Sequence, residues 1–264
     1  MMKFWKKALL TVAALTLGTS AGISSIHAAS SAVNSELKNK GELTIGLEGT
    51  YSPYSYRKNN KLTGFEVDLG KAVAKKMGLK AKFVPTKWDS LVAGLGSGKY
   101  DVVMNNITQT PERAKQYNFS TPYIKSRFAL IVPADSKIKS LKDIKGKKVV
   151  AGTGTNNADI AKKFGAKLVP NGDFASAVGM IKQGRADAEI NSREAWHAYS
   201  KKNSTKGLKM IDVSSEQKPA KISALFNKKD TAIQSSYNKA LKELQQDGTV
   251  KKLSEKYFGA DITE

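Results

Sequence analysis

The sequence predicts an α/β protein made of two successive α/β units with a cleft between them. Short apolar runs of strand type alternate with segments of helical periodicity, which is typical of parallel α/β sheets. The same alternation starts again near Phe128, without a clear internal repeat. Polar side chains and one arginine follow directly after a predicted strand, which is the end of an open α/β sheet where ligands bind.

The first unit follows a polar lead-in over residues 30–40. Phe65, Leu69 and Val73 recur at helical spacing, and Gly78 is a usual stop for a helix. The elements expected in chain order are a strand over 41–47, a helix over 64–77, a strand over 81–85, a helix over 88–95 and a strand over 101–104.

The second unit is predicted from the same alternation. Its expected elements are a strand over 128–132, a short helix over 140–144, a strand over 148–151, a helix over 155–164, a strand over 168–169, a helix over 174–183, a strand over 186–190 and a helix over 192–202. A strand over 222–226 and two helices over 231–246 and 249–257, which Asp247-Gly248 separates, complete the chain.

The first 28 residues predict a secretory signal peptide. Three lysines precede a short apolar run over residues 8–17, and Ile26-His27-Ala28 is a suitable cleavage site. The apolar run is too short to span a bilayer comfortably, although an uncleaved anchor is the alternative. We therefore expect an exported protein.

The chain is strongly basic and contains no cysteine. Its formal net charge is +21, and removal of the three lysines of the signal peptide leaves +18. Without cysteine the protein can carry neither a disulfide nor a lipid-modified cysteine, so we expect charge to retain it at the cell surface. Such a charge favours an anionic partner, and a cell-wall polymer suits an exported chain better than nucleic acid. The basic residues include these pairs: Lys75-Lys76, Lys147-Lys148, Lys162-Lys163, Lys201-Lys202, Lys228-Lys229 and Lys251-Lys252.

The residue inventory limits enzyme chemistry. After removal of the signal peptide, His197 is the only histidine, which disfavours a zinc site or a Cys/His nucleophile pair. His197 lies in a predicted amphipathic helix, where a surface or half-buried histidine is expected. We expect neither a metal nor a cofactor.

The most informative motif comes after the strand predicted over 101–104. It reads Asn105-Asn-Ile-Thr-Gln-Thr-Pro-Glu-Arg113 and is followed by Phe119-Ser-Thr-Pro-Tyr123. The guanidinium of arginine is suited to grip a planar carboxylate with two parallel hydrogen bonds. The alternative is an arginine that is paired with an acid at the start of a helix.

This motif, together with Gly64-Phe-Glu-Val-Asp-Leu69, resembles the extracytoplasmic amino-acid-binding proteins of ABC importers, solute-binding protein family 3. The resemblance implies a two-lobed periplasmic-binding-protein-like fold of type II with a two-strand hinge. Lobe 1 would comprise residues 41–125 and 220–260, and lobe 2 would comprise residues 126–219. Segment 64–69 is expected to be structural.

The resemblance also implies which residues of lobe 1 bind the ligand. Arg113 would hold the α-carboxylate, while the carbonyl of Asn106 and the hydroxyl of Thr108 would accept protons of the α-ammonium. Glu48 would face the ligand side chain, Tyr51 would pack on it, and Trp88 would close over it. For Trp88 a place in the core is the alternative.

In lobe 2, the backbone N–H groups of Gly154 and Thr155 are expected at a helix start, where they could grip the same carboxylate. A dinucleotide fingerprint is disfavoured, because Asn157 stands where that motif needs glycine. Many relatives carry an aspartate at the position of Ser192, next to Asn191. Its absence leaves Glu194 and Glu189 as alternative partners of the ligand ammonium.

These observations favour a monomeric binding protein that delivers an amino acid to an ABC permease by closure of its lobes. The resemblance favours cystine first, and glutamine or another polar amino acid second. One alternative is a surface adhesin that uses its basic exterior to bind host matrix. Another is an enzyme similar to the exported cyclohexadienyl dehydratases, with Glu48 or Glu189 as general acid or base.

Overall fold

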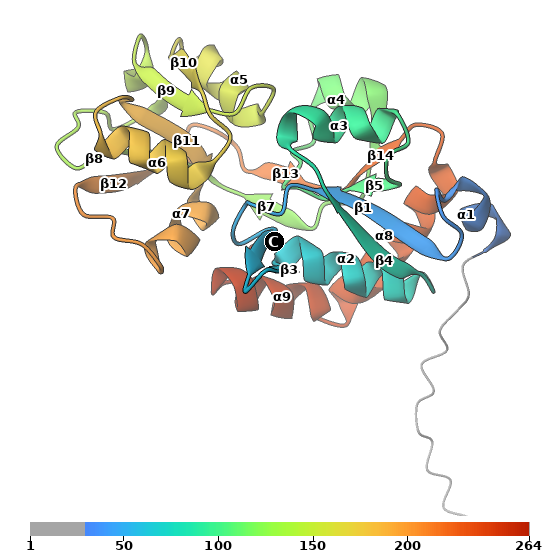
Figure 1. The fold of residues 1–264 in the computed structure, drawn as a ribbon. Coiled ribbons are helices and arrows are strands. Elements are labelled where there is room, and N and C mark those ends of the chain that lie inside the picture. Colours follow the sequence, from blue (N-terminus) through green and yellow to red (C-terminus); the bar gives the residue numbers. More distant parts are fainter. Residues whose placement is uncertain (1–29, 264) are drawn as a thin grey trace, which may run out of the picture.

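The computed structural model describes residues 30–263, and the predicted signal peptide lies outside them. Two lobes lie side by side, joined by two short strands (Figure 1). The prediction of a two-lobed α/β fold with a two-strand hinge is confirmed. The hinge strands are β7 (Ile124–Ser126) and β13 (Ala220–Ile222), which pair antiparallel.

Lobe 1 takes segments from both ends of the described chain. Its elements are α1 (Ser31–Glu36), β1 (Glu42–Leu47), β2 (Tyr56–Lys58), β3 (Lys61–Thr63), α2 (Phe65–Lys76), β4 (Lys80–Pro85), α3 (Trp88–Gly96), β5 (Val102–Val103), α4 (Pro111–Gln116), β6 (Tyr117–Phe119), β14 (Leu225–Asn227), α8 (Thr231–Gln246) and α9 (Thr249–Phe258). The strand order of its main sheet is β4-β1-β5-β14-β6.

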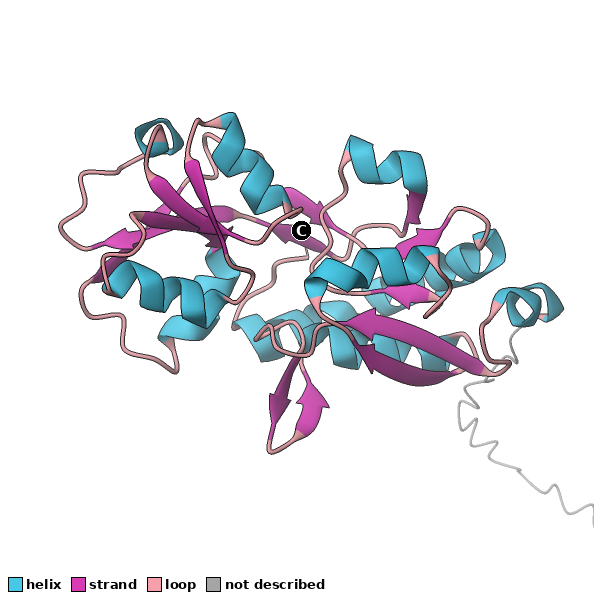
Figure 2. Cartoon of the chain, turned by 45° about the horizontal axis from the view of Figure 1, so that its top comes forward, coloured by secondary structure: helices cyan, strands magenta, loops and turns pink. Residues whose placement is uncertain are grey.

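Lobe 2 is formed by one continuous segment. Its elements are β8 (Phe128–Pro133), the 3-10 helix η1 (Leu141–Ile144), β9 (Lys148–Ala151), α5 (Asn156–Lys163), β10 (Lys167–Pro170), α6 (Phe174–Lys182), β11 (Ala188–Ser192), α7 (Arg193–Ser200) and β12 (Leu208–Asp212). The strand order is β10-β9-β11-β8-β12, and helices flank the strands of both lobes (Figure 2).

Both sheets are mixed, whereas the sequence alternation predicted parallel sheets. Strands β4, β1 and β5 are parallel, but β14 runs antiparallel to β5. In lobe 2, β8 runs antiparallel to β11. The reason is that the chain passes through the hinge twice, once into lobe 2 through β7 and once back into lobe 1 through β13. A strand that begins where the chain enters a lobe runs away from the cleft, whereas the parallel strands end at the cleft.

Two local predictions were wrong. The strand expected over 222–226 is divided into β13, which belongs to the hinge, and β14, which belongs to the main sheet of lobe 1. The lead-in over 30–40 contains a helix, α1, capped by Ser30. The carboxylate of Glu36 in α1 accepts the N–H groups of Ala232 and Ile233 at the start of α8, at 3.1 and 2.9 Å. A negative charge at a helix start is favourable because of the helix dipole.

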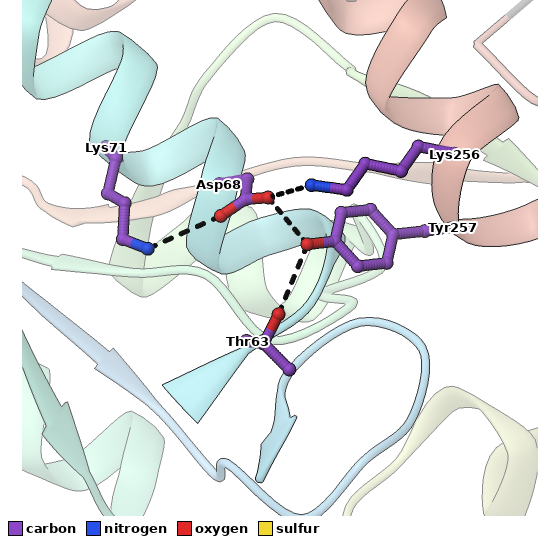
Figure 3. Close-up of polar contacts among 5 residues, drawn as sticks. All are labelled: Thr63, Asp68, Lys71, Lys256 and Tyr257. Carbon is purple, nitrogen blue, oxygen red and sulfur yellow. Dashed lines mark hydrogen bonds and ion pairs between the residues drawn. The ribbon is translucent and has the colours of Figure 1, made fainter. Parts of the chain in front are cut away.

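Asp68 of α2 ties the outer elements of lobe 1 together (Figure 3). Its carboxylate accepts the hydroxyl of Tyr257 at 2.6 Å and the ammonium of Lys256 at 2.8 Å, both from α9. Lys71 lies 3.4 Å from the other carboxylate oxygen, and Thr63 of β3 contacts the hydroxyl of Tyr257 at 3.3 Å. This network holds the β2–β3 hairpin, α2 and α9 in one unit, away from the cleft.

Among the described residues, we find no helix with the length and apolar character needed to cross a membrane.

Candidate ligand-binding cleft

A cavity lies between the two lobes, where the parallel strands of both sheets end. Glu48 follows β1, Asn105 and Asn106 follow β5, Gly152 follows β9, and β11 ends with Asn191 and Ser192. Strands that end at one edge bring side chains that are distant in sequence together. Nine of the eleven predicted site residues line this cavity: Glu48, Tyr51, Trp88, Asn106, Thr108, Arg113, Thr155, Asn191 and Ser192.

The start of α4 places Arg113 in the cavity. The hydroxyl of Thr110 caps α4 by accepting the N–H of Arg113, and Pro111 occupies the first helical position. The guanidinium donates to the backbone oxygens of Thr108 and Gly154, each at 3.0 Å. It also lies over the ring of Trp88, 5.6 Å from the ring centroid.

The guanidinium of Arg113 has only neutral oxygen partners. No ion pair between described residues includes it, so the alternative of a salt-bridged arginine at a helix start is not found. Burial lowers the pKa of Arg113 from its ordinary value, because it penalises the charged form. A carboxylate entering the cavity would supply the missing negative charge and would form a charge-assisted, forked pair.

Glu48 is held by a reciprocal pair of hydrogen bonds with Asn105. The backbone N–H of Glu48 donates to the side-chain oxygen of Asn105 at 2.9 Å, and the amide of Asn105 donates to the Glu48 carboxylate at 2.7 Å. Burial raises the pKa of Glu48 above its usual range. The carboxylate is therefore oriented at the cavity wall without a cationic partner among the described residues.

Glu189 of β11 is the acid that lobe 2 presents to the cavity. Its side chain is 3 % exposed, and one oxygen accepts the amide of Asn191 at 2.9 Å. The other oxygen has no hydrogen-bond partner among the described residues, and neither has the side-chain oxygen of Asn106 in lobe 1. Burial raises the pKa of Glu189 well above its ordinary value. Two buried acceptors without donors, from opposite lobes, suit a donor-rich cationic group.

Glu194 does not line the cavity, although the sequence left it as an alternative to Glu189. Its carboxylate accepts the hydroxyl of Ser126 and the N–H of Arg127, each at 3.3 Å. Glu194 is therefore bonded to the end of the hinge strand β7. The two acids differ because Glu189 lies within β11, whereas Glu194 lies in the first turn of α7.

The helix start in lobe 2 also differs from the expectation. Gly154 does not line the cavity, and its carbonyl, not its N–H, faces Arg113. The N–H of Thr155 donates to Gly152 at 3.2 Å, and its hydroxyl caps α5. The next two residues, Asn156 and Asn157, do line the cavity, and first-turn N–H groups have no partner within a helix. These two N–H groups replace those of Gly154 and Thr155 as candidates for carboxylate binding.

Direct hydrogen bonds join the lobes across the cleft. The hydroxyl of Tyr51 donates to Asn191 at 2.7 Å, and the hydroxyl of Tyr54 lies 3.0 Å from that of Ser192. The indole of Trp88 donates to the backbone oxygen of Thr153 at 2.8 Å. Tyr54 is fully buried, as expected for a core aromatic, but its hydroxyl reaches lobe 2. The structure thus has a closed arrangement of the lobes.

Sequence reasoning missed several lining residues. Asn171 and Gly172 follow β10 directly, and Asn156 and Asn157 begin α5. A position just after a strand or at a helix start is the same signal that predicted the other site residues, so it could have identified these four as well. Ser126, Ala220 and Ile222 line the cavity from the hinge, where no comparable sequence signal exists. The exposed position of His197 is the one expected from sequence.

Comparison with known proteins identifies the family. The profile of the bacterial extracellular solute-binding proteins, family 3, matches residues 43–260. The chain is 39 % identical over 261 residues to a probable amino-acid ABC transporter-binding protein of Haemophilus influenzae, covering 98 % of this chain and 100 % of the relative. It is 39 % identical over 231 residues to the L-cystine-binding protein TcyA of Bacillus subtilis, covering 86 % of this chain and 85 % of TcyA.

A solved structure is also similar. The L-cystine solute receptor of Neisseria gonorrhoeae, in its unliganded open conformation, is 40 % identical with a TM-score of 0.61, and the match covers 88 % of this chain and 97 % of the receptor. Sequence and fold are thus both similar to those of the relatives named above. The chain belongs to the bacterial extracellular solute-binding proteins, family 3.

Proposed function

We propose that this protein captures an amino acid, cystine in the first place, in the cleft between its lobes and delivers it as a monomer to an ABC permease. The observation that carries the proposal is the charge arrangement of the cavity. Among residues 30–263, Arg113 of lobe 1 has no carboxylate partner, and Glu189 of lobe 2 has an oxygen without a donor. An α-carboxylate on Arg113 and an α-ammonium on Glu189 would be bound by both lobes at once and would therefore stabilise closure.

The second acid of the cavity, Glu48, is the feature that bears on the choice between cystine and glutamine. The described lining residues include two carboxylates, those of Glu48 and Glu189, but only one cationic group, the guanidinium of Arg113. Glutamine carries one ammonium group, which leaves Glu48 without a cation. Cystine carries a second ammonium group, which Glu48 would meet, and a second carboxylate, for which no further cationic side chain lines the described cavity. The names of two similar proteins, in Bacillus subtilis and Neisseria gonorrhoeae, refer to L-cystine and support the same ligand.

A thermal-shift screen over the amino acids and cystine tests this proposal. A ligand that binds only the native state raises stability by RT ln(1 + [L]/Kd), about 2.7 kcal/mol at one hundred times Kd. We expect cystine to give the largest shift and glutamine a smaller one, with calorimetry confirming the order. No shift with any amino acid would disprove the proposal. Turnover of prephenate or arogenate would instead favour the dehydratase alternative.

We also propose that charge, not lipid, holds the exported protein at the cell exterior through an anionic wall polymer. All six lysine pairs predicted from the sequence are exposed on the surface. The absence of cysteine from the sequence leaves no thiol for acylation. A role in binding host matrix would use the same basic surface, but it would not use the cleft. The charge arrangement of the cleft therefore favours ligand capture as the main role.

A further inference from the structure

We propose that Glu66 is a positioning residue of the cleft, whose carboxyl group holds the backbone of Asn106 in place and links this loop to the hinge. The proposal rests on the function proposed above, because Asn106 is part of that ligand site. Glu66 belongs to segment 64–69, which the sequence indicated only as structural.

One carboxyl oxygen of Glu66 accepts two hydrogen bonds. The backbone N–H of Asn106 donates to it at 2.7 Å, and the hydroxyl of Tyr123 donates to it at 2.6 Å. Glu66 and Tyr123 are both fully buried. Bonds to an ionised acceptor are short and stronger than neutral ones. Tyr123 immediately precedes hinge strand β7, so a single oxygen joins the cavity loop to the hinge.

The backbone of Asn106 needs such support. Its φ angle is +50°, a left-handed conformation that is uncommon for non-glycine residues and that asparagine adopts more readily than most. The other described non-glycine residues with positive φ, Asn59 and Asn60, are exposed at the tip of the β2–β3 hairpin. Asn106 instead lines the cavity, and its side-chain oxygen has no partner there. The bond from its N–H to Glu66 therefore fixes a residue that is poised for a ligand donor.

The position of Glu66 is itself set by close packing at the start of α2. The N–H of Glu66 donates to the backbone oxygen of Tyr54 at 2.9 Å. Gly64 has a φ angle of +133°, and a Cβ atom at this position would lie 2.2 Å from the same oxygen of Tyr54. The first turn of α2 therefore packs closely against the loop that contains Tyr51 and Tyr54. In contrast, Asp68, two residues later in the same turn, points to α9 (Figure 3).

Affinity measurements on three variants test the proposal. Glu66→Leu removes the acceptor and leaves two buried donors without a partner, so we expect cystine affinity to fall about tenfold or more. Glu66→Gln keeps one acceptor oxygen, so we expect affinity within about threefold of wild type. Asp68→Asn is the matched control from the same segment. It should lower the melting temperature and leave affinity within about twofold, because the polar partners of the Asp68 side chain are Lys71 of α2 and Lys256 and Tyr257 of α9, none of which lines the cavity.

A second measurement, an NMR titration, needs no ligand. It compares the wild type with Glu66→Gln, both of which keep an oxygen that can accept the N–H of Asn106. Burial raises the pKa of Glu66 to about 7. The titratable groups around it are Tyr54, Tyr123, Tyr237 and Glu48. We expect the amide proton of Asn106, followed by NMR, to shift with a midpoint near pH 7 in the wild type and to stay unshifted over that range in Glu66→Gln.

The outcomes separate this proposal from the proposed function. If the wild type binds no amino acid, the proposed function is wrong, and the amide titration still tests the bond between Glu66 and Asn106. If the wild type binds cystine and folded Glu66→Leu binds equally well, Glu66 does not position the site. An Asn106 amide signal with the same pH dependence in the wild type and in Glu66→Gln overturns the proposal regardless of ligand.

Discussion

The indole nitrogen of Trp88 in lobe 1 donates a hydrogen bond of 2.8 Å to the backbone oxygen of Thr153 in lobe 2. The same ring lies beneath the guanidinium of Arg113, 5.6 Å from its centroid. One side chain therefore supports the proposed carboxylate-binding group and also joins the two lobes. This double role links ligand contact to closure in the arrangement seen here.

Replacement of Trp88 by phenylalanine tests that link. Trp88→Phe keeps an aromatic ring near Arg113 but removes the bond to Thr153, a loss of about 1 kcal/mol, or about fivefold in affinity. We expect the loss mainly as faster ligand release, measured by stopped-flow fluorescence. Trp196→Phe is the control, because Trp196 packs inside lobe 2. An unchanged release rate in Trp88→Phe would show that the bond contributes nothing to closure.

Replacement of Arg113 by lysine tests forked recognition of the carboxylate. Arg113→Lys keeps the positive charge but loses the planar pair of donors, and Arg113→Ala loses both. We expect Arg113→Ala to weaken binding by roughly 2–5 kcal/mol and Arg113→Lys by less, with the fold intact by circular dichroism. Arg193→Lys, at a surface ion pair with Asp212, serves as control. Calorimetric affinity of Arg113→Ala within threefold of wild type would exclude this assignment.

Paired glutamine variants identify the partner of the ligand ammonium. Glu189 lines the cavity with an oxygen that no described residue bonds, whereas Glu194 is bonded to Ser126 and Arg127 at the hinge. Glu189→Gln should therefore weaken binding by about tenfold or more, and Glu194→Gln should change it far less. Isothermal titration at one pH compares them directly. Equal affinities for both variants and the wild type would mean that neutral groups meet the ammonium.

The stability of the ligand-free protein should depend on pH through Glu66. Its pKa is about 7 in the folded protein and near its ordinary value of 4.5 in the unfolded chain. Below pH 4.5 the carboxyl is protonated in both states. Between pH 4.5 and 7 the unfolded state ionises first, so the folded state loses stability by up to about 1.4 kcal/mol per pH unit, and above pH 7 the loss is constant.

Glu66→Gln does not titrate and should escape this loss. We expect its free energy of unfolding, relative to the wild type, to rise between pH 5 and pH 8 in urea titrations. Comparing the two proteins cancels the contribution of Glu48, which is present in both. A difference between them that is the same at both pH values would contradict a raised pKa of Glu66.

Salt should release the mature protein from intact cells without detergent. Exposed charges are screened over roughly 10 Å at 0.1 M salt but only roughly 3 Å at 1 M, so attraction of a +18 chain to a wall polymer weakens sharply. Cells that lack the anionic polymer should shed the protein at low salt. Full retention at high salt, with extraction by detergent alone, would instead indicate an N-terminal anchor.

The helices and central strands could be predicted because their apolar residues follow regular periods. Helices α2, α8 and α9 lie within a residue or two of their predicted ranges, as does strand β1. Short or exposed elements carry too few periodic residues to be recognised, and this explains why α1 and the β2–β3 hairpin were not identified. The division of β13 from β14 depends on the hinge, which lies outside any local pattern.

For the site, the sequence by itself determined which residue types follow the strands, including Glu48, Asn105 and Asn106. It did so because the placement of a side chain just past a strand is a local property of the chain. Only the tertiary structure decided that Glu189 faces the cavity while Glu194 faces the hinge, and that Glu66 supports Asn106. These choices depend on contacts between residues about 40 to 70 positions apart, which form within folded lobe 1 for Glu66 and between lobe 2 and the hinge for Glu194, and no local pattern of the sequence specifies them.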